Sequence, residues 1–297
     1  MKLPFIRINF VAIWQFIRNY LLTKRKKVMC FRKLFPNWFK PDPPPVVIPY
    51  KRKALLFAIN NYPGTANDLN GCLNDQSDVE KKLFELFPDF TIKKFKDSEV
   101  TKDRFITELR QALNSLKSGE VLLVHYSGHG TQVFDTHGDE KDGYDEAIYL
   151  YNGYVVDDDI GVELRTIPDG AYVVLLFDSC FSESITRAIL PQGSENKFVQ
   201  MPGLPLSKHR KKIVNFKAEF NYIVMSGCQE NQTSADAFIN GRFNGAFTYY
   251  ALKALTSKDL TYSAWFKEML AEFDRSQYDQ VPTLEGREDL LNRRLFT

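Results

Sequence analysis

Short apolar runs alternate with amphipathic segments along most of the chain after residue 50. The runs Ala54–Ile59, Glu120–Tyr126 and Tyr172–Phe177 are aliphatic or β-branched and bounded by turn residues, which is typical of buried strands in a parallel sheet. Shorter strands are expected at 91–95 and 221–225, a hairpin at 147–156, and helices at 73–87, 101–116, 157–164, 246–255 and 262–273. Regular alternation of strands and helices predicts an α/β fold with helices on both faces of the sheet.

Two of these apolar runs end beside reactive side chains. One leads into Ser127-Gly-His129-Gly and the other into Asp178-Ser-Cys180. Ligands of open α/β sheets bind outside the carboxyl ends of the strands, so neighbouring strands would bring His129 and Cys180 face to face. An imidazole that takes the thiol proton produces the thiolate that attacks as a nucleophile.

Cys180 and His129 are therefore the candidate nucleophile and base. The backbone amides of Gly130 and Cys180 are candidate donors of an oxyanion hole. Taken singly, the two residues have ordinary interpretations, as a buried apolar thiol and a hydrogen-bonded loop histidine. Their joint occurrence at two strand ends favours catalysis.

Composition excludes several other classes of protein. With 297 residues, 44% of them hydrophobic and 26% charged, the chain has the make-up of a soluble globular protein. The four cysteines are far apart in sequence and form no CxxC pair, and we expect no secretory leader, because no small-residue cleavage site follows the first apolar stretch. These features argue against a disulfide framework or a zinc site, and they predict a reducing, cytoplasmic location.

The first fifty residues differ in charge from the remainder. Residues 1–50 carry a net charge of +9 and residues 51–297 a net charge of −7. The basic, aromatic segment ends in a proline-rich linker at 42–49, so we expect a domain boundary near residue 50. This extension, through residues 1–40, is either an amphipathic helix that docks on an anionic membrane or a partner, or a solvated or core-docked segment. Nucleic acid is a weaker expectation, because the segment has no recognisable nucleic-acid motif.

Residues 187–220 interrupt the alternation of strands and helices. They are polar, contain three prolines and include the basic cluster Lys208-His-Arg-Lys-Lys212. A loop of this length in a compact domain is usually either functional or disordered. This one follows the candidate nucleophile directly.

Several motifs resemble those of metacaspases, the caspase-like cysteine peptidases of non-animal lineages. The two catalytic motifs of that family are similar to Tyr126-Ser-Gly-His129-Gly-Thr-Gln and Phe177-Asp-Ser-Cys180. Further matching segments follow in order: 58–62, 69–75, 138–146, 156–159 and 226–236. The resemblance covers about residues 53–297 and puts residues 1–50 in place of a type I prodomain. It implies a caspase-like three-layer sandwich with a six-stranded, mostly parallel sheet. It also implies a cysteine endopeptidase that cleaves after Arg or Lys, and a monomer, as most members of the family are.

The resemblance also implies the residues of the primary specificity pocket. Asp75 and Asp178 would line it together with Cys72 and Ser127. Two carboxylates suit the guanidinium or ammonium group of a basic substrate residue. On ordinary grounds, Asp75 is an acid at a helix start and Asp178 an acid in a turn.

A calcium site is a further implication, with one departure from the family pattern. Asp145, Asp157 and Asp158 stand where metacaspases hold Ca²⁺, and hard oxygen ligands suit that ion. A fourth acid is expected seven residues after the nucleophile, but Arg187 stands there. The alternative is that the acids near 157 cap a helix N-terminus.

Basic clusters are candidate sites of self-processing for a zymogen that cleaves after Arg or Lys. The candidate residues are Lys53, at the end of the linker, and Lys208, Arg210, Lys211 and Lys212 in the long loop. The alternative is that both clusters are solvated charge runs. A second hypothesis for the whole chain is a caspase-fold scaffold that binds partners without turnover.

Overall fold

The computed structural model describes residues 51–135, 144–179, 194–201, 221–227, 235–278 and 280–297. The chain divides after Pro49 into two units, and every described residue belongs to the second of them. None of the helices in these ranges is long and apolar enough to cross a bilayer.

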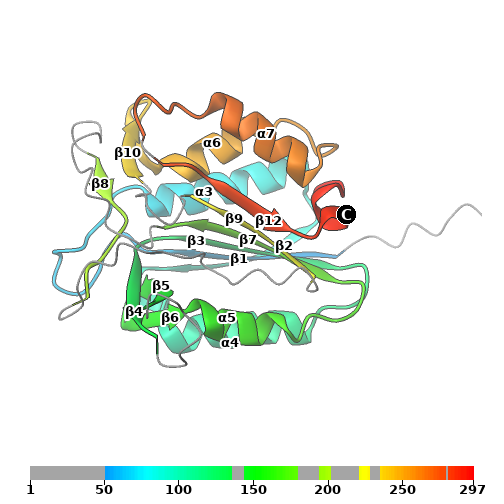
Figure 1. Cartoon of the computed structure of the whole chain (residues 1–297), viewed down its shortest axis with the longest axis horizontal. Helices are drawn as coiled ribbons and strands as arrows, with labels where there is room; N and C mark the ends of the chain where they lie inside the picture. The colour runs from blue at the N-terminus through cyan, green and yellow to red at the C-terminus, as the bar shows by residue number, and fades with distance from the viewer. Residues whose placement is uncertain (1–50, 136–143, 180–193, 202–220, 228–234, 279) are drawn as a thin grey trace, which may run out of the picture. The chain divides into compact units, whose positions relative to one another are not determined.

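A six-stranded sheet forms the centre of the described unit, in the order β12-β9-β7-β3-β1-β2 (Figure 1). Its strands are β1 (Arg52–Ala58), β2 (Phe90–Lys96), β3 (Val121–Ser127), β7 (Tyr172–Asp178), β9 (Tyr222–Ser226) and β12 (Thr283–Gly286). The first five run parallel, and β12 pairs antiparallel with β9 at one edge. The expected six-stranded, mostly parallel sheet is therefore confirmed.

Helices cover both faces of this sheet (Figure 1). One layer contains α3 (Cys72–Leu86), α6 (Ala246–Ala254) and α7 (Tyr262–Glu272), and the other contains α4 (Lys102–Asn114) and α5 (Asp157–Leu164). Alternate residues of each central strand point to opposite faces. In β3, for example, Leu123 joins the core beneath the first layer, whereas Leu122 and Val124 join the core beneath the second.

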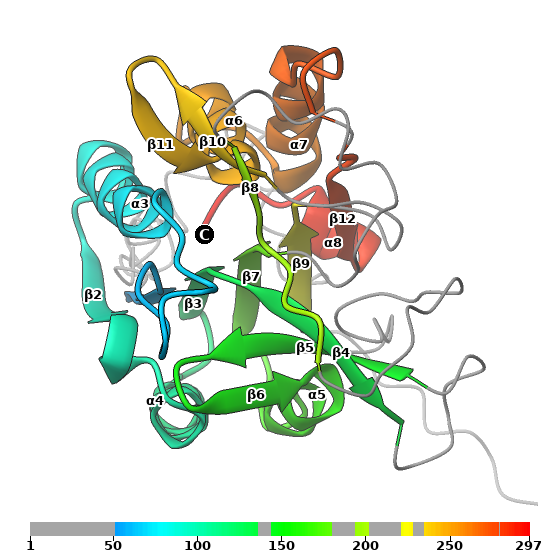
Figure 2. The same cartoon turned by 90° about the vertical axis from the view of Figure 1, so that its left-hand side faces the viewer.

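Two small sheets lie beyond the carboxyl ends of the central strands (Figure 2). One consists of β4 (Gly130–Phe134), β5 (Tyr144–Leu150) and β6 (Gly153–Val156), and the other of β8 (Glu195–Asn196), β10 (Ala235–Ile239) and β11 (Arg242–Gly245). Two short helices complete the assignment, η2 (Asp97–Glu99) and α8 (Glu288–Leu291).

The segment 194–201 differs from the sequence-based expectation of a long loop over 187–220. Residues 195–196 pair with β10, and Phe198 bridges to Gly130 at the start of β4. Figure 2 shows this segment running from the β10–β11 hairpin toward β4. A polar sequence gives no apolar alternation to indicate a strand, and its pairing partners are distant in sequence.

Candidate active site

The register of three parallel strands brings the predicted site residues to one edge of the sheet. Ala58 of β1 pairs with Ser127 of β3, and Ser127 pairs with Asp178 of β7. These strands therefore end at the same level. Helix α3 begins at Cys72, so the side chains of its first turn lie over that edge.

Asp75, on the first turn of α3, is the centre of a buried polar cluster. Its carboxylate accepts hydrogen bonds from the Ser127 hydroxyl at 2.7 Å, the Asn244 side-chain amide at 3.0 Å and the Gly245 backbone amide at 2.9 and 3.0 Å. Asp178 is equally buried, and its Oδ2 accepts from the Thr248 amide at 2.9 Å. The carboxylates of Asp75 and Asp178, two of the four predicted pocket residues, are thus fully buried.

The side chain of Lys197 lies between these two carboxylates. Its Nζ is 3.1 Å from Asp178 Oδ1 and 3.4 Å from Asp75 Oδ2, and it donates to the Ser127 hydroxyl at 2.9 Å. Lys197 is 0% exposed, which is rare for a lysine unless it is paired. The acidic cluster is therefore a closed ammonium-binding site, and a lysine of the same chain fills it.

The electrostatics of the cluster follow from its burial. Burial raises the pKa of Asp75 to about 7, while Lys197 acts to lower it and Asp178 to raise it further. Burial alone would lower the pKa of Lys197, but the carboxylates of Asp178 and Asp75 outweigh that effect and hold it above its ordinary value. The ammonium group is therefore charged at neutral pH. Cys72 forms a wall of the cluster, and burial raises the pKa of its thiol, so it packs as an apolar group.

Gly245 is a glycine for a steric reason. A Cβ at this position would clash with the Asp178 carboxylate and with the Lys197 ammonium. The backbone of β11 thus forms the floor of the ammonium site.

His129 is fixed through its backbone and through one ring nitrogen. Its amide donates to the Tyr62 hydroxyl at 2.9 Å, and its carbonyl accepts from the Tyr126 hydroxyl at 2.7 Å. The ring Nε2 lies 2.8 Å from the carbonyl oxygen of Asn67. A carbonyl only accepts, so Nε2 carries the proton and Nδ1 has its lone pair available. Within the described residues, Nδ1 has no hydrogen-bond partner.

The His129 ring is neutral at physiological pH. Burial lowers its pKa to about 4, and the hydrogen bond to the Asn67 backbone acts in the opposite direction. The side chain is 4% exposed. A neutral imidazole with an available Nδ1 has the protonation state that a general base requires.

Cys180, the predicted nucleophile, lies outside the described residues, which reach Ser179 on this side of the site. The predicted oxyanion-hole donor Gly130 is described, and its amide donates to the carbonyl oxygen of Lys197 at 2.9 Å. The structure therefore brings together His129, Gly130, Cys72, Asp75, Ser127 and Asp178 at one edge.

The predicted calcium ligands belong to the β5–β6 hairpin and the helix after it. Asp145 lies in β5, and Asp157 and Asp158 begin α5. In the part of the chain that the structure describes, no three His, Cys, Asp or Glu side chains are grouped so that they could hold a metal ion. Arg187 is outside that part. The described residues alone thus do not supply a complete set of ligands, and calcium binding stays a prediction.

Lys53, one of the predicted processing residues, lies inside the sheet. It is in β1, where it pairs with Thr91 on one side and Leu122 on the other. Peptidases bind extended, accessible segments, so this placement argues against cleavage at Lys53 in the folded protein. Lys208, Arg210, Lys211 and Lys212 lie outside the described residues.

Comparisons with known proteins agree with the fold. The family model of the caspase domain, Peptidase C14, matches residues 51–290. Metacaspase-1 of Meyerozyma guilliermondii is 30% identical over 80% of this chain and 69% of its own length, and that of Schizosaccharomyces pombe is 27% identical over 79% and 67%. The chain thus spans about two thirds of the length of these relatives.

Solved structures give the same fold. A Geobacter sulfurreducens protein superposes with a TM-score of 0.65 at 26% identity, over 83% of this chain and 98% of its own. Caspase-1 of Spodoptera frugiperda superposes with a TM-score of 0.55 over 82% of this chain and 88% of its own, and at 13% identity that likeness shows the fold alone. The class is therefore a cysteine-type peptidase of caspase-like fold. The chain belongs to the caspase domain family, and its resemblance to metacaspases is confirmed.

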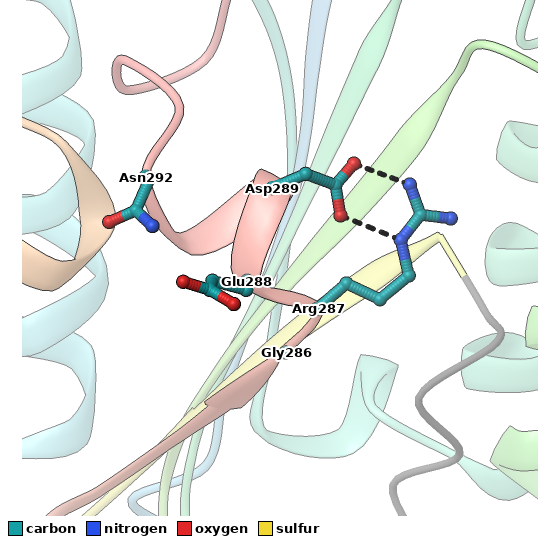
Figure 3. Close-up of a pocket in the computed structure, with 5 residues that line it drawn as sticks. All are labelled: Gly286, Arg287, Glu288, Asp289 and Asn292. Atoms are coloured by element: carbon teal, nitrogen blue, oxygen red, sulfur yellow. Dashed lines mark hydrogen bonds and ion pairs between the residues drawn. The ribbon is translucent and has the colours of Figure 1, made fainter.

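A separate pocket lies at the start of α8, near the end of the sheet where the parallel strands begin (Figure 3). It is lined by Gly286, Arg287, Glu288, Asp289 and Asn292. Gly286 pairs with Ile223 near the start of β9, far along the strand from the carboxyl edge. Arg287 forms a two-point ion pair with Asp289 and donates to Asn221 at 2.6 Å. Arg287 is therefore fully engaged by Asp289 and Asn221 at this end of the sheet.

Sequence reasoning missed three residues of the site. Lys197 is a single lysine in a polar loop, and nothing in its sequence neighbourhood distinguishes it from a solvated lysine. Tyr62 and Asn67 act through a hydroxyl and a backbone carbonyl, from a loop distant in sequence from His129. The tyrosine belongs to a segment that matches the family, and this is the available signal for it.

Proposed function

We propose that this peptidase cleaves proteins on the carboxyl side of Arg and Lys, with Cys180 as its nucleophile and His129 as its base. The observation that carries the proposal is the buried acidic cluster of Asp75 and Asp178. It holds an ammonium group, that of Lys197, at salt-bridge distance from both carboxylates. A pocket for an acidic substrate residue would need the opposite charge.

The proposed chemistry is acyl transfer in two steps. His129 Nδ1 takes the thiol proton, and the Cys180 sulfur attacks the carbonyl carbon of the basic residue. The amide of Gly130 donates to the oxygen that becomes negative in the tetrahedral intermediate. The carbon–nitrogen bond then breaks, and the amine leaves with the proton from His129. Water hydrolyses the thioester, with His129 as base, and restores the thiol.

The ring orientation supports this role for His129. The Asn67 carbonyl accepts the Nε2 proton, so it fixes the tautomer in which Nδ1 is the base. The same carbonyl stabilises the imidazolium that forms when Nδ1 takes the thiol proton.

Further properties belong to the proposal without entering the chemistry. Calcium activation through Asp145, Asp157 and Asp158 would set conformation or charge near α5, and no step of catalysis passes through the ion. A cytoplasmic, monomeric enzyme whose residues 1–40 dock on a membrane or a partner is consistent with the basic composition of that segment.

Hydrolysis of fluorogenic peptides that end in Arg, Lys or Asp tests this function. We expect cleavage after Arg and Lys, none after Asp, and no cleavage by Cys180→Ala. Parallel reactions with calcium and with chelator measure whether activity requires the ion. Inertness toward all three peptides under both conditions would favour the scaffold hypothesis.

A further inference from the structure

Two buried tyrosine hydroxyls hold the backbone of the proposed base, His129. The His129 amide donates to the Tyr62 hydroxyl at 2.9 Å, and the Tyr126 hydroxyl donates to the His129 carbonyl at 2.7 Å. Both hydroxyls also lie near the carbonyl oxygen of Tyr149 in β5, at 3.3 Å from Tyr62 and 2.7 Å from Tyr126. A phenol has one proton, so the Tyr62 hydroxyl accepts from His129 and donates to Tyr149. The turn that carries the imidazole is thereby fixed to β5.

The residue before His129 is a glycine because of these two hydroxyls. A Cβ at Gly128 would clash with the hydroxyl groups of both Tyr126 and Tyr62. Both phenol rings are buried and both hydroxyls are hydrogen-bonded, so they could move aside only by breaking those bonds. The tyrosine pair thus occupies the space that a side chain at position 128 would need.

Tyr62 contacts the imidazole as well as the backbone of His129. The centroids of the two rings are 5.0 Å apart, and their planes make an angle of 52°. The Tyr62 ring also stacks on the Tyr149 ring, with centroids 5.6 Å apart and an angle of 25°. A ring held in this way limits the tilt of the imidazole beside it. Tyr62 therefore constrains both the backbone and the side chain of the base.

Tyr62 is held in turn by a loop that is tied to Asp97, at the start of η2. Asp97 Oδ1 accepts from the backbone amides of Asn60 and Asn61 at 2.8 and 2.9 Å, and its Oδ2 accepts from the Asn61 side chain at 3.1 Å. The next amide, that of Tyr62, donates to Asp68 Oδ1 at 2.8 Å. Three successive amides of this loop thus donate to carboxylates.

The backbone of Asp97 adopts an unfavourable conformation to make these contacts. Its φ is 45°, in the left-handed region that residues other than glycine adopt rarely, although aspartate tolerates it better than most. Such conformations persist where the surrounding structure over-determines them, and they concentrate at functional sites. Here the three hydrogen bonds to the Asp97 carboxylate supply that support. The loop is therefore held in one position relative to His129.

We propose that Tyr62 is a positioning residue for the general base, and that Asp97 acts on His129 through Tyr62. The inference rests on the proposed function, which makes His129 the base. Asp75 and Asp178 accept their hydrogen bonds from other residues, so the acidic pocket lies outside this chain of contacts. Loss of the Tyr62 hydroxyl should therefore slow the chemical step and leave the affinity for substrate unchanged.

Steady-state kinetics of Tyr62→Phe on Arg peptides tests the proposal, because phenylalanine keeps the ring and removes the hydroxyl. We expect kcat to fall about 10- to 100-fold, as for a small displacement of a reacting group, with KM changed less than twofold. Tyr172→Phe is the matched control. Tyr172 is buried at the amino end of β7, and its hydroxyl lies 3.2 Å from that of Tyr262. Its kcat should change less than twofold. Equal losses of kcat in the two variants, or a Tyr62→Phe effect confined to KM, overturns the inference.

Asp97 variants carry the test where Tyr62→Phe does not fold. Asp97→Ala removes the carboxylate and should lower kcat about as much as Tyr62→Phe. Asp97→Asn keeps an oxygen for the two backbone amides and tolerates the left-handed conformation, so it should retain most of the wild-type kcat. Equal kcat in the two Asp97 variants contradicts the proposal. Where both single variants fold, Tyr62→Phe with Asp97→Ala should be no slower than the slower of them, because the two residues act in series. Losses that multiply overturn the role given to Asp97.

Nuclear magnetic resonance of the Cys180→Ala protein separates this inference from the proposed function. With isotope-labelled histidine, the Nε2 proton of His129, which the Asn67 carbonyl accepts, should give a signal that exchanges slowly with water. His129→Gln identifies that signal. We expect it to vanish in Tyr62→Phe and to persist in Tyr172→Phe. Its persistence in Tyr62→Phe, or its absence from the parent, overturns the inference even where the wild type cleaves Arg peptides. Its selective loss in Tyr62→Phe supports the hold of Tyr62 on His129 even where no peptide is cleaved and the proposed function fails.

Discussion

Asp75 accepts hydrogen bonds from Ser127 of β3 and from two residues of β11, Asn244 and Gly245. It also faces the ammonium of Lys197. At the scale of single residues, we therefore propose that this carboxylate helps to determine which charge the pocket accepts. A charge-assisted contact of this kind contributes about 1.5–3 kcal/mol. The resemblance to metacaspases supplied Asp75 and Asp178 for this pocket, but only the fold could reveal the lysine between them.

Replacing Asp75 by Asn tests this role. We expect Asp75→Asn to lower kcat/KM for Arg peptides about 10- to 100-fold, from the loss of that charge-assisted contact. Glu85→Gln, farther along the same helix and paired with Lys82 at the surface, is the control and should change kcat/KM less than twofold. Equal losses in the two variants would show that the effect is a general one of charge.

The pKa of Asp75 predicts a pH dependence with a definite sign. Burial raises this pKa to about 7, so the carboxylate is ionised above pH 7 and protonated below it. We expect kcat/KM for Arg peptides to fall as the pH drops from 8 to 6. His129, with its pKa lowered to about 4, stays neutral over this range and does not contribute. The fall should be absent in Asp75→Asn, and an unchanged profile in that variant would assign it to another group.

At the scale of elements, the sequence predicted the central strands and helices to within about two residues. β1, β3 and β7 are short runs of aliphatic residues buried on both faces, and such runs have few other structures open to them. The strands β4, β8, β10, β11 and β12 were not predicted. They are short, several are polar, and their pairing depends on residues far away in sequence. The pairing of these strands around the site was therefore not predicted from the sequence, although Gly130 of β4 was among the candidate residues.

The two helical layers contribute to stability through their buried faces. Phe105 of α4 is 0% exposed and contacts the Phe57 ring, whereas Phe84 of α3 is 56% exposed. We expect Phe105→Ala to reduce the free energy of unfolding by about 3–5 kcal/mol and Phe84→Ala by less than about 0.5 kcal/mol. Urea titration in the Cys180→Ala background measures both without self-cleavage. Similar losses of unfolding free energy at the two positions would contradict the assignment of Phe105 to the core and of Phe84 to the surface.

At the scale of the whole molecule, the chain combines a basic extension with a peptidase domain of opposite net charge. Residues 1–50 carry +9, and the domain match begins at residue 51. We expect the full chain to bind vesicles that contain anionic lipid, and to lose that binding at 0.5 M salt or on deletion of residues 1–50. Binding of DNA in preference to vesicles, or retention of vesicle binding after the deletion, would contradict a membrane role.

Covalent labelling tests the central claim most directly, because one experiment identifies the nucleophilic residue and the charge that the pocket accepts. The wild type, incubated until its intact mass is constant, is treated with two thiol-reactive peptide ketones that differ only in ending with Arg or Asp. We expect one adduct, on Cys180 and from the Arg probe alone, and a much slower reaction in His129→Gln. An adduct on another cysteine, or equal labelling by the Asp probe, would contradict the assignment of Cys180, His129 and the acidic pocket.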